Sequence, residues 1–155
     1  MKPFYLFIIL IFIVSCKNDS DSKMSDNAMS ESVPQPTMKG TWKQISFYNY
    51  ADNKVVDTIT ASESNKQIKM YSDTKVMWSR FRDADSIDWF GFGDYTIGDG
   101  ILTEVIDYGS KAMNAAIKED NEFSFKLILE KDNFTQIEMD EEGNFIYAEN
   151  YIRIE

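Results

Sequence analysis

The sequence predicts an all-β domain, an eight-to-nine-stranded antiparallel up-and-down β-barrel with one short helix. Three observations support this fold class. From residue 40 onward, apolar and aromatic residues recur with a period of two, as strands with one buried face require. These runs are short and are separated by turn residues. Only one segment holds good helix formers in succession.

The expected strands follow one another as hairpins. The first run covers residues 42–50, and residues 55–59 continue it after a turn at 51–53. The later runs are 67–72, 75–82, 92–97, 101–108, 122–130, 134–139 and 144–154. Before residue 101, Gly98-Asp99-Gly100 supplies the positive φ that a tight hairpin needs. Residues 111–118 are expected to form the short helix.

Consecutive hairpins without long crossover segments favour a closed meander over a β-sandwich, which is the alternative architecture. Closure removes the exposed edges of an antiparallel sheet. A barrel of about eight strands either holds one small ligand or is filled by its own side chains. We assign residues 39–155 to this barrel.

The composition excludes several kinds of chemistry. The 155 residues include no histidine and one cysteine, which excludes a Ser-His-Asp triad, His-ligated zinc and an intramolecular disulfide. Asp and Glu number 26 against 16 Lys and Arg, giving a formal charge of -10. Nucleic-acid binding needs a basic surface, so we expect no nucleic-acid partner. We also expect no cofactor, and the sequence names no protein partner.

The N-terminal segment has the pattern of a signal peptide. Lys2 precedes an apolar run at residues 4–14, too short for a bilayer core that requires about twenty residues. The run ends in Ile13-Val14-Ser15-Cys16, which resembles the bacterial lipobox. This resemblance implies that residues 1–15 are removed and that Cys16 is lipidated, so that the acyl chains anchor the protein to a membrane. An ordinary secretory signal or an uncleaved anchor is the alternative.

Residues 16–38 are expected to form a disordered tether behind the lipidated cysteine. They are rich in Ser, Asp, Asn and Met, include Pro34 and Pro36, and show no apolar periodicity. Lys17, where an aspartate would resemble an inner-membrane retention signal, implies the outer membrane of a Gram-negative bacterium. Which face of that membrane carries the protein is left open.

Gly40-Thr41-Trp42 at the start of the first strand resembles the Gly-x-Trp signature of lipocalins. In that family the tryptophan closes one end of the barrel, and an arginine near the end of the last strand packs across it. The resemblance assigns these roles to Trp42 and Arg153, and a guanidinium over an indole is a favourable cation–π contact. The calycin-like barrel that we expect has no cysteine pair to staple it.

The whole stretch from residue 40 to residue 155 resembles the small lipocalin-like domains of bacterial lipoproteins. The segments that carry this resemblance are Gly40-Thr41-Trp42, Met77-Trp78-Ser79-Arg80-Phe81, Gly93-Asp94-Tyr95-Thr96, Leu102-Thr103-Glu104 and residues 149–153. It implies the fold more directly than it implies a ligand. The function expected from it is binding of a small, partly apolar molecule in the barrel.

Alternation along the strands assigns the side chains that should face the interior. The candidate ligand-binding residues are Trp78, Arg80, Tyr95, Glu104, Tyr108, Phe125 and Tyr147. In the functional interpretation, the aromatic residues pack a ligand while Arg80 and Glu104 orient its polar group. In the structural interpretation, Arg80–Glu104 and Glu149–Arg153 are ion pairs that fill a narrow barrel, which then serves as a structural or protein-interaction module.

Two further hypotheses concern acidic residues. The loop at residues 83–88 is acidic enough to suggest calcium, but it lacks the glycine and glutamate of a calcium-binding loop, so we expect no metal. Glu104 and Glu149 suggest an acid–base pair like that of glycoside hydrolases. Nothing in their spacing requires catalysis, and we predict no catalytic residue. The short helix is expected to pack on the barrel or cap its mouth.

Overall fold

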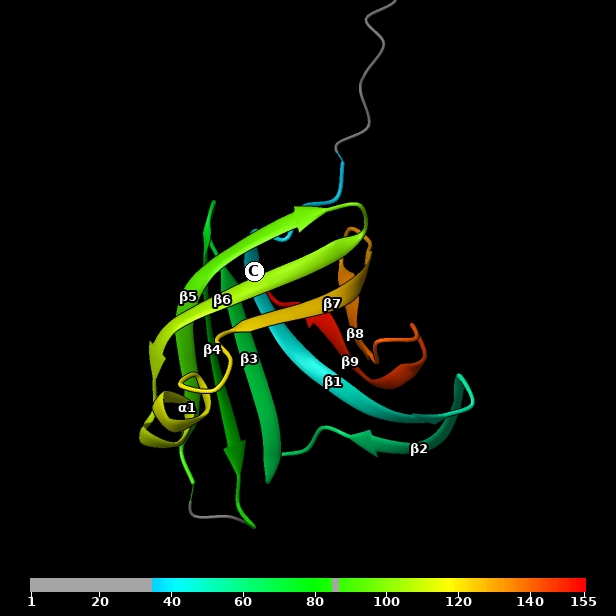
Figure 1. Cartoon of the computed structure of the whole chain (residues 1–155), viewed down its shortest axis with the longest axis horizontal. Coiled ribbons are helices and arrows are strands. Elements are labelled where there is room, and N and C mark those ends of the chain that lie inside the picture. Colours follow the sequence, from blue (N-terminus) through cyan, green and yellow to red (C-terminus); the bar gives the residue numbers. More distant parts are fainter. Residues whose placement is uncertain (1–34, 85–86) are drawn as a thin grey trace, which may run out of the picture. The chain divides into compact units, whose positions relative to one another are not determined.

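The computed structural model describes residues 35–84 and 87–155 (Figure 1). These residues form nine strands and one helix. The strands are β1 (Gly40–Ala51), β2 (Lys54–Thr60), β3 (Asn65–Tyr71), β4 (Lys75–Arg82), β5 (Trp89–Gly98), β6 (Ile101–Gly109), β7 (Glu122–Leu129), β8 (Asn133–Met139) and β9 (Phe145–Arg153). The helix α1 (Lys111–Ala116) lies between β6 and β7. The predicted fold class is confirmed, and each predicted run forms one strand.

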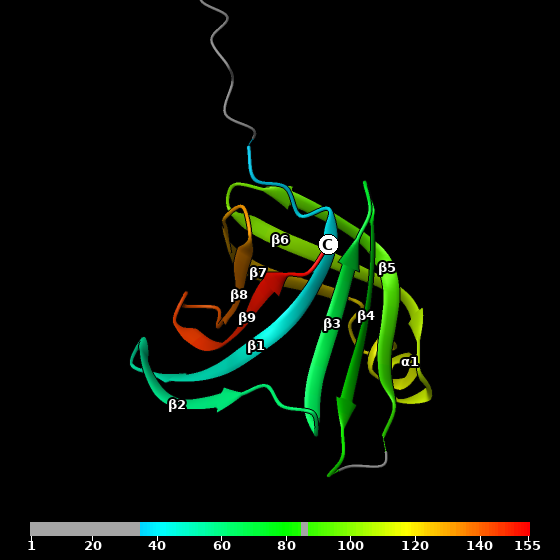
Figure 2. The same ribbon diagram turned by 180° about the vertical axis from the view of Figure 1, so that it is seen from behind.

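The strands close into a ring. From β3 to β9 each strand pairs antiparallel with the next, and β1 joins β3 to β9. Figures 1 and 2 show this ring from opposite sides. One continuous sheet therefore surrounds the interior, which distinguishes the protein from the β-sandwich alternative.

Strand β1 has two neighbours along one of its edges. Its residues 40–43 pair with β3, whereas residues 46–51 pair with β2. Between these two stretches Ile45 forms a bulge, because the register with β9 shifts between Gln44 and Ser46. A bulge bends its strand. The β1–β2 hairpin thus leaves the ring, and every residue of β2 is exposed.

Two tight hairpins have the local conformation that their sequences favour. Asp52 and Asn53 connect β1 to β2 with φ values of 50° and 58°. Asp99 and Gly100 connect β5 to β6 with φ values of 52° and 76°. Two consecutive residues with positive φ match the right-handed twist of the flanking strands, and Asn, Asp and Gly tolerate this conformation best.

Helix α1 packs on β5 and β6 at one end of the barrel (Figure 1). The Ser110 hydroxyl caps its first turn by accepting a hydrogen bond from the Met113 backbone N–H at 3.2 Å. The Asn114 side chain holds the preceding strand end through the N–H and the carbonyl of Gly109. Met113 is the buried residue of the helix and joins the core of the barrel.

Candidate functional site

One end of the barrel is closed by Trp42 and Arg153. The two residues lie opposite each other in the β1–β9 pairing, with the Arg153 guanidinium carbon 4.0 Å from the centre of the Trp42 ring. Trp42 is fully buried, and its indole N–H donates to the Met38 carbonyl at 2.7 Å. The guanidinium donates to the carbonyls of Thr37, Lys39 and Lys131. The arginine thereby holds residues 37–39 across this end.

Aromatic rings fill the barrel beneath this closure. Phe134 meets Trp42 edge to face at 4.9 Å between ring centres and stacks on Tyr151 at 4.5 Å. Met38 also belongs to this cluster and is 2% exposed, although the sequence analysis placed it in the tether. Tyr71 packs edge to face against Phe134, with 6.2 Å between the ring centres. We call these five residues the closed-end cluster.

Below the closed-end cluster, a buried ion pair crosses the barrel. The Lys69 ammonium lies 2.9 and 3.1 Å from the two carboxylate oxygens of Glu104, and 2.8 Å from the amide oxygen of Gln136. The Tyr71 hydroxyl donates to the same carboxylate. Lys69, Glu104 and Gln136 are each 2% exposed. Removing one charge would leave the other buried without a partner. This costs far more stability than breaking an ion pair on the surface.

A second polar cluster adjoins the first. The Glu149 carboxylate accepts hydrogen bonds from Gln136 at 2.8 Å, from Tyr151 at 2.7 Å and from Arg80 at 3.2 Å. The Arg80 Nε also donates to the Gln67 amide oxygen at 2.7 Å. Two cations therefore balance two anions inside the barrel. Among the described residues, every fully buried side-chain nitrogen or oxygen has a hydrogen-bond partner.

The tyrosine hydroxyls in these clusters act as donors. Burial, with the Glu104 carboxylate adding to it, raises the pKa of Tyr71 well above its usual value. Burial and the Glu149 carboxylate do the same to the pKa of Tyr151. At neutral pH both phenols stay protonated, so each supplies a hydrogen to a carboxylate instead of a competing charge.

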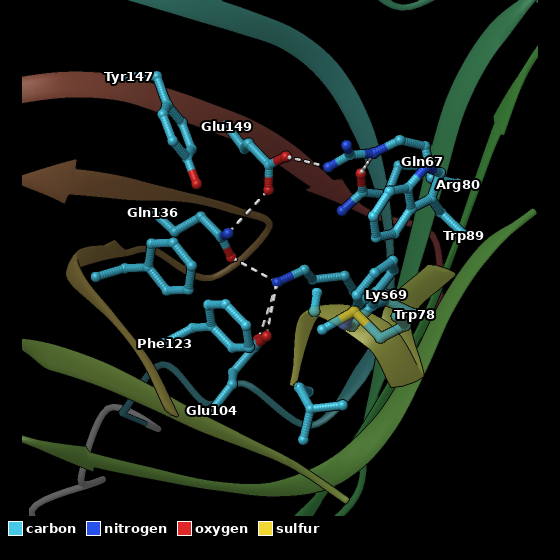
Figure 3. Close-up of a pocket in the computed structure, with 14 residues that line it drawn as sticks. Gln67, Lys69, Trp78, Arg80, Trp89, Glu104, Phe123, Gln136, Tyr147 and Glu149 are labelled. Carbon is cyan, nitrogen blue, oxygen red and sulfur yellow. Dashed lines mark hydrogen bonds and ion pairs between the residues drawn. The ribbon is translucent and has the colours of Figure 1, made fainter. Parts of the chain in front are cut away.

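A cavity of about 210 Å³ lies beside the two polar clusters (Figure 3). Six polar side chains and a set of aromatic ones line it, together with α1. The lining residues are Gln67, Lys69, Arg80, Glu104, Gln136 and Glu149, the aromatic Trp78, Trp89, Phe123, Phe125 and Tyr147, and Ile106, Met113 and Ala116. In Figure 3, Phe123 and Tyr147 stand on one side of this space and Trp78 and Trp89 on the other. Exposed Ala116 and half-buried Arg80 mark the end that opens to solvent, which we call the open end.

The position of Trp78 depends on a glycine in the neighbouring strand. Trp78 in β4 pairs with Gly91 in β5. A Cβ atom at Gly91 would lie 3.0 Å from three atoms of the indole ring. The ring therefore lies against the glycine backbone, an arrangement by which an aromatic residue covers a glycine in a sheet. A larger residue there would push the indole out of place.

Five of the seven predicted ligand-binding residues line the cavity: Trp78, Arg80, Glu104, Phe125 and Tyr147. Tyr95 does not line it. Its ring meets Tyr71 edge to face, and its hydroxyl donates to the Ser72 carbonyl at 2.9 Å. Tyr108 is 55% exposed and packs on Phe92 outside the barrel.

The outward position of Tyr108 corrects the face assigned to it, and the cause is a bulge. Phe92 pairs with Tyr108 while Gly93 pairs with Ile106, so Asp107 is an extra residue in β6. An extra residue reverses the alternation beyond it. Leu102, Glu104 and Ile106 precede the bulge and face inward, as strict alternation predicts. Tyr108 follows the bulge and faces outward.

Neither of the two expected ion pairs forms. Glu104 pairs with Lys69 in place of Arg80, and Arg80 pairs with Glu149. Arg153 pairs with neither glutamate, because its guanidinium is engaged by backbone carbonyls and by the Trp42 ring. Arg80, Glu104 and Glu149 enter the barrel as expected, whereas Lys69 takes the place expected for Arg153 as the second interior cation. Which strands lie opposite one another across its interior decides the pairing, and alternation along one strand cannot supply that.

Lys69, Gln67, Gln136 and Trp89 are among the cavity residues that were not predicted from the sequence. Lys69 and Gln67 alternate with Tyr71 along β3. That alternation would have placed both residues inside the barrel if a buried lysine had been considered. Trp89 lies ahead of the predicted start of its strand, and Gln136 lies between Phe134 and Glu138 on the inner face of β8.

The calcium hypothesis falls on a loop that the structure describes only in part, since residues 85 and 86 lie outside the described residues. Within residues 35–84 and 87–155, no group of three or more acidic or cysteine side chains is arranged to hold a metal ion. In the same ranges, no helix has the length and apolar character needed to span a membrane. Cys16 and the predicted signal peptide lie outside the described residues.

Comparison with known proteins gives the fold. No family model matches the chain, and no curated protein matches it. A solved structure of a lipocalin-like protein from Bacteroides uniformis is similar, with a TM-score of 0.50 at 12% identity over 75% of this chain and 97% of that one. An uncharacterized protein from Bacteroides eggerthii gives a TM-score of 0.48 at 16% identity over 74% and 98% of the two chains. The first similarity, with the closed ring, shows that the fold is lipocalin-like.

Proposed function

We propose that the protein is a lipid-anchored binding protein of the cell envelope that holds one small molecule in its barrel. The observation that carries this proposal is the cavity of about 210 Å³ lined by aromatic and polar side chains. Ligand sites combine apolar walls with a few polar groups in the same way. The volume lies below the roughly 300 Å³ at which ordinary ligand pockets begin. The ligand is therefore small, with about one ring, and is not a long acyl chain.

Binding is favoured over carboxylate catalysis by the state of the two buried glutamates. The Glu104 carboxylate is held by Lys69 and Tyr71, and the Glu149 carboxylate by Arg80, Gln136 and Tyr151. A general base must be within reach of the proton that it abstracts and free to accept it. Neither carboxylate has that freedom, so we assign both to the scaffold of the site.

A second candidate function is a ligand-free structural module of the envelope. The observation that favours it is the completeness of the polar network, in which every fully buried side-chain nitrogen and oxygen of the described residues is already partnered. The two candidates differ in one measurable respect. A carrier purified from its host should retain a bound molecule, whereas a scaffold with a filled barrel should not.

Native mass spectrometry of the mature protein purified from its own host tests this difference. We expect a reproducible small bound mass. Ala116 lines the cavity and is exposed, so Ala116→Trp should obstruct the mouth and abolish the bound mass. The neighbouring Ala115 does not line this cavity, and Ala115→Trp is the matched control that should retain it. No bound mass in the wild type would favour the structural module, and equal retention by both variants would show that the bound molecule does not occupy this cavity.

The anchor is proposed from the sequence around Cys16. Its lipobox resemblance supports lipidation, and Lys17 supports delivery to the outer membrane. We expect Cys16→Ser to move the protein from the membrane fraction to the soluble fraction. Ser15→Ala keeps a small residue before the cysteine and is the control that should stay with the membrane. Membrane association of Cys16→Ser would overturn the anchor without touching the binding proposal.

A further inference from the structure

We infer that the ligand is an uncharged molecule whose polar atoms accept hydrogen bonds, such as a ketone or another carbonyl compound, on an apolar body of about one ring. This inference rests on the proposed function and defines the chemistry of that site. The cavity wall supports it in two ways: some of its hydrogen-bond donors are free, and its charges are balanced.

The carboxylate and amide oxygens of the wall are engaged. Each carboxylate oxygen of Glu104 and of Glu149 receives at least one hydrogen bond. The amide oxygen of Gln67 receives one from Arg80, and that of Gln136 receives one from Lys69. A ligand that offers donors would have to compete with these contacts.

Several donors of the wall are not engaged. The indole N–H groups of Trp78 and Trp89 have no acceptor among the described residues, in contrast to Trp42. Neither nitrogen is fully buried, since every fully buried side-chain nitrogen in the described ranges has a partner, and both indole rings line the cavity. Arg80 uses its Nε and one Nη2 hydrogen, which leaves three of its five guanidinium hydrogens for another acceptor. The site therefore has free hydrogen-bond donors, which a ligand with acceptor atoms would satisfy.

The charges of the wall favour a neutral molecule. Lys69 and Arg80 are balanced by Glu104 and Glu149. A ligand carboxylate at Arg80 would approach the Glu149 carboxylate that Arg80 already neutralises. A ligand ammonium would approach the two cations. Either ion would leave a net charge in a partly desolvated site, which is costly. A carbonyl oxygen meets the free donors without that cost.

Four single-ring probes separate these requirements: acetophenone, ethylbenzene, benzoate and benzylamine. The measurement is the indole region of a ¹⁵N–¹H correlation spectrum, in which the three tryptophans give three resonances. We expect acetophenone to shift the Trp78 and Trp89 resonances and to leave that of Trp42, which is bonded to the Met38 carbonyl. A neutral hydrogen bond is worth about 1 kcal/mol, so acetophenone should bind about fivefold or more tighter than ethylbenzene. Benzoate and benzylamine should bind more weakly than acetophenone.

Trp89→Phe keeps an aromatic wall and removes one donor. We expect it to weaken acetophenone binding about fivefold and to leave ethylbenzene binding unchanged. Trp78→Phe is the second variant, in case the first alters the packing, and an unchanged unfolding midpoint shows that each variant is folded.

The outcomes separate the inference from the proposal beneath it. If ethylbenzene, benzylamine or benzoate binds as tightly as acetophenone, the site binds molecules but the acceptor or charge inference is wrong. Loss of ethylbenzene binding together with acetophenone binding in both variants would likewise overturn the role of the indole donors. If none of the four probes shifts the Trp78 or Trp89 resonance, the inference and the proposed function are both overturned.

Discussion

The two ends of the barrel are built from the same kinds of residue, but they differ in whether the hydrogen-bonding groups of those residues are already engaged. At the closed end, the Trp42 indole N–H is bonded to a backbone carbonyl and its ring is covered by Arg153. At the open end, Trp78 and Trp89 keep free N–H groups beside a cavity. An aromatic residue with every group engaged stabilises the fold, whereas one with a free donor at a cavity is available to a ligand.

The buried ion pair separates these two ends. On one side, Glu104 accepts a hydrogen bond from Tyr71 and the Lys69 ammonium lies 5.9 Å from the centre of the Tyr151 ring, both in the closed-end cluster. On the other side, Lys69 and Glu104 line the cavity. Position along the barrel thus divides its interior into a part devoted to stability and a part open to binding. Substitutions at the two ends test that division.

Trp42→Ala should have the largest effect on stability. It removes a fully buried indole, its hydrogen bond to Met38 and the surface on which Arg153 lies. Truncating a buried aromatic residue typically lowers the free energy of unfolding by about 3 to 5 kcal/mol. Trp89→Ala at the open end should cost less than half as much, because that ring is only partly buried. Equal losses in urea unfolding would show that the two ends do not differ.

Glu104→Gln should follow, with a loss of about 3 kcal/mol. The amide can still accept from Tyr71, but the Lys69 ammonium would be left buried without its counter-charge. The double variant Lys69→Met with Glu104→Gln removes that charge and should recover part of the loss. Urea unfolding of the two single variants and the double variant measures the coupling. A double loss equal to the sum of the single losses would show that the pair is not coupled.

The sequence predicted strands and inward faces well, because period-two alternation is a local property. The lipocalin resemblance placed Trp42 beside Arg153, and alternation placed Trp78, Arg80 and other candidates on the cavity wall. The prediction failed at Tyr108 because the bulge at Asp107 depends on how β5 and β6 pair. It failed at Lys69 because the partner that makes a buried lysine acceptable, Glu104, lies 35 residues away in sequence. The ion-pair partners depend on distances across the barrel, which no single strand encodes.

Gly91→Ala should have a moderate effect that is specific to the open end. Its methyl group would lie 3.0 Å from the Trp78 indole, so the ring must move or the strands must separate. Overpacking of this kind costs about 1 to 2 kcal/mol. Gly98→Ala in the same strand meets no atom within 4 Å and is the matched control, with little or no loss. The Trp78 indole resonance should shift in the first variant alone, and an unshifted resonance would contradict the packing role of Gly91.

Glu138, whose carboxylate accepts a hydrogen bond from Tyr147 at the cavity, should give the smallest effect. Partial burial raises the pKa of Glu138, and the hydrogen bond from Tyr147 opposes that rise. A carboxyl group with a higher pKa in the folded state binds its proton more tightly when folded. The free energy of unfolding therefore falls as pH rises from the ordinary glutamate pKa through the raised one.

Glu138→Gln keeps an acceptor for Tyr147 and removes this titration. Relative to the wild type, the variant should gain stability across that pH window and keep a constant advantage above it. Glu138 is half-exposed, and solvent screening should hold the gain below about 0.5 kcal/mol. Urea midpoints of both proteins from pH 4 to pH 7 give the difference, in which the titration of other carboxylates cancels. If the variant instead loses stability relative to the wild type as pH rises, the folded protein stabilises the Glu138 charge. This part of the open end would then contribute to stability, as the closed end does.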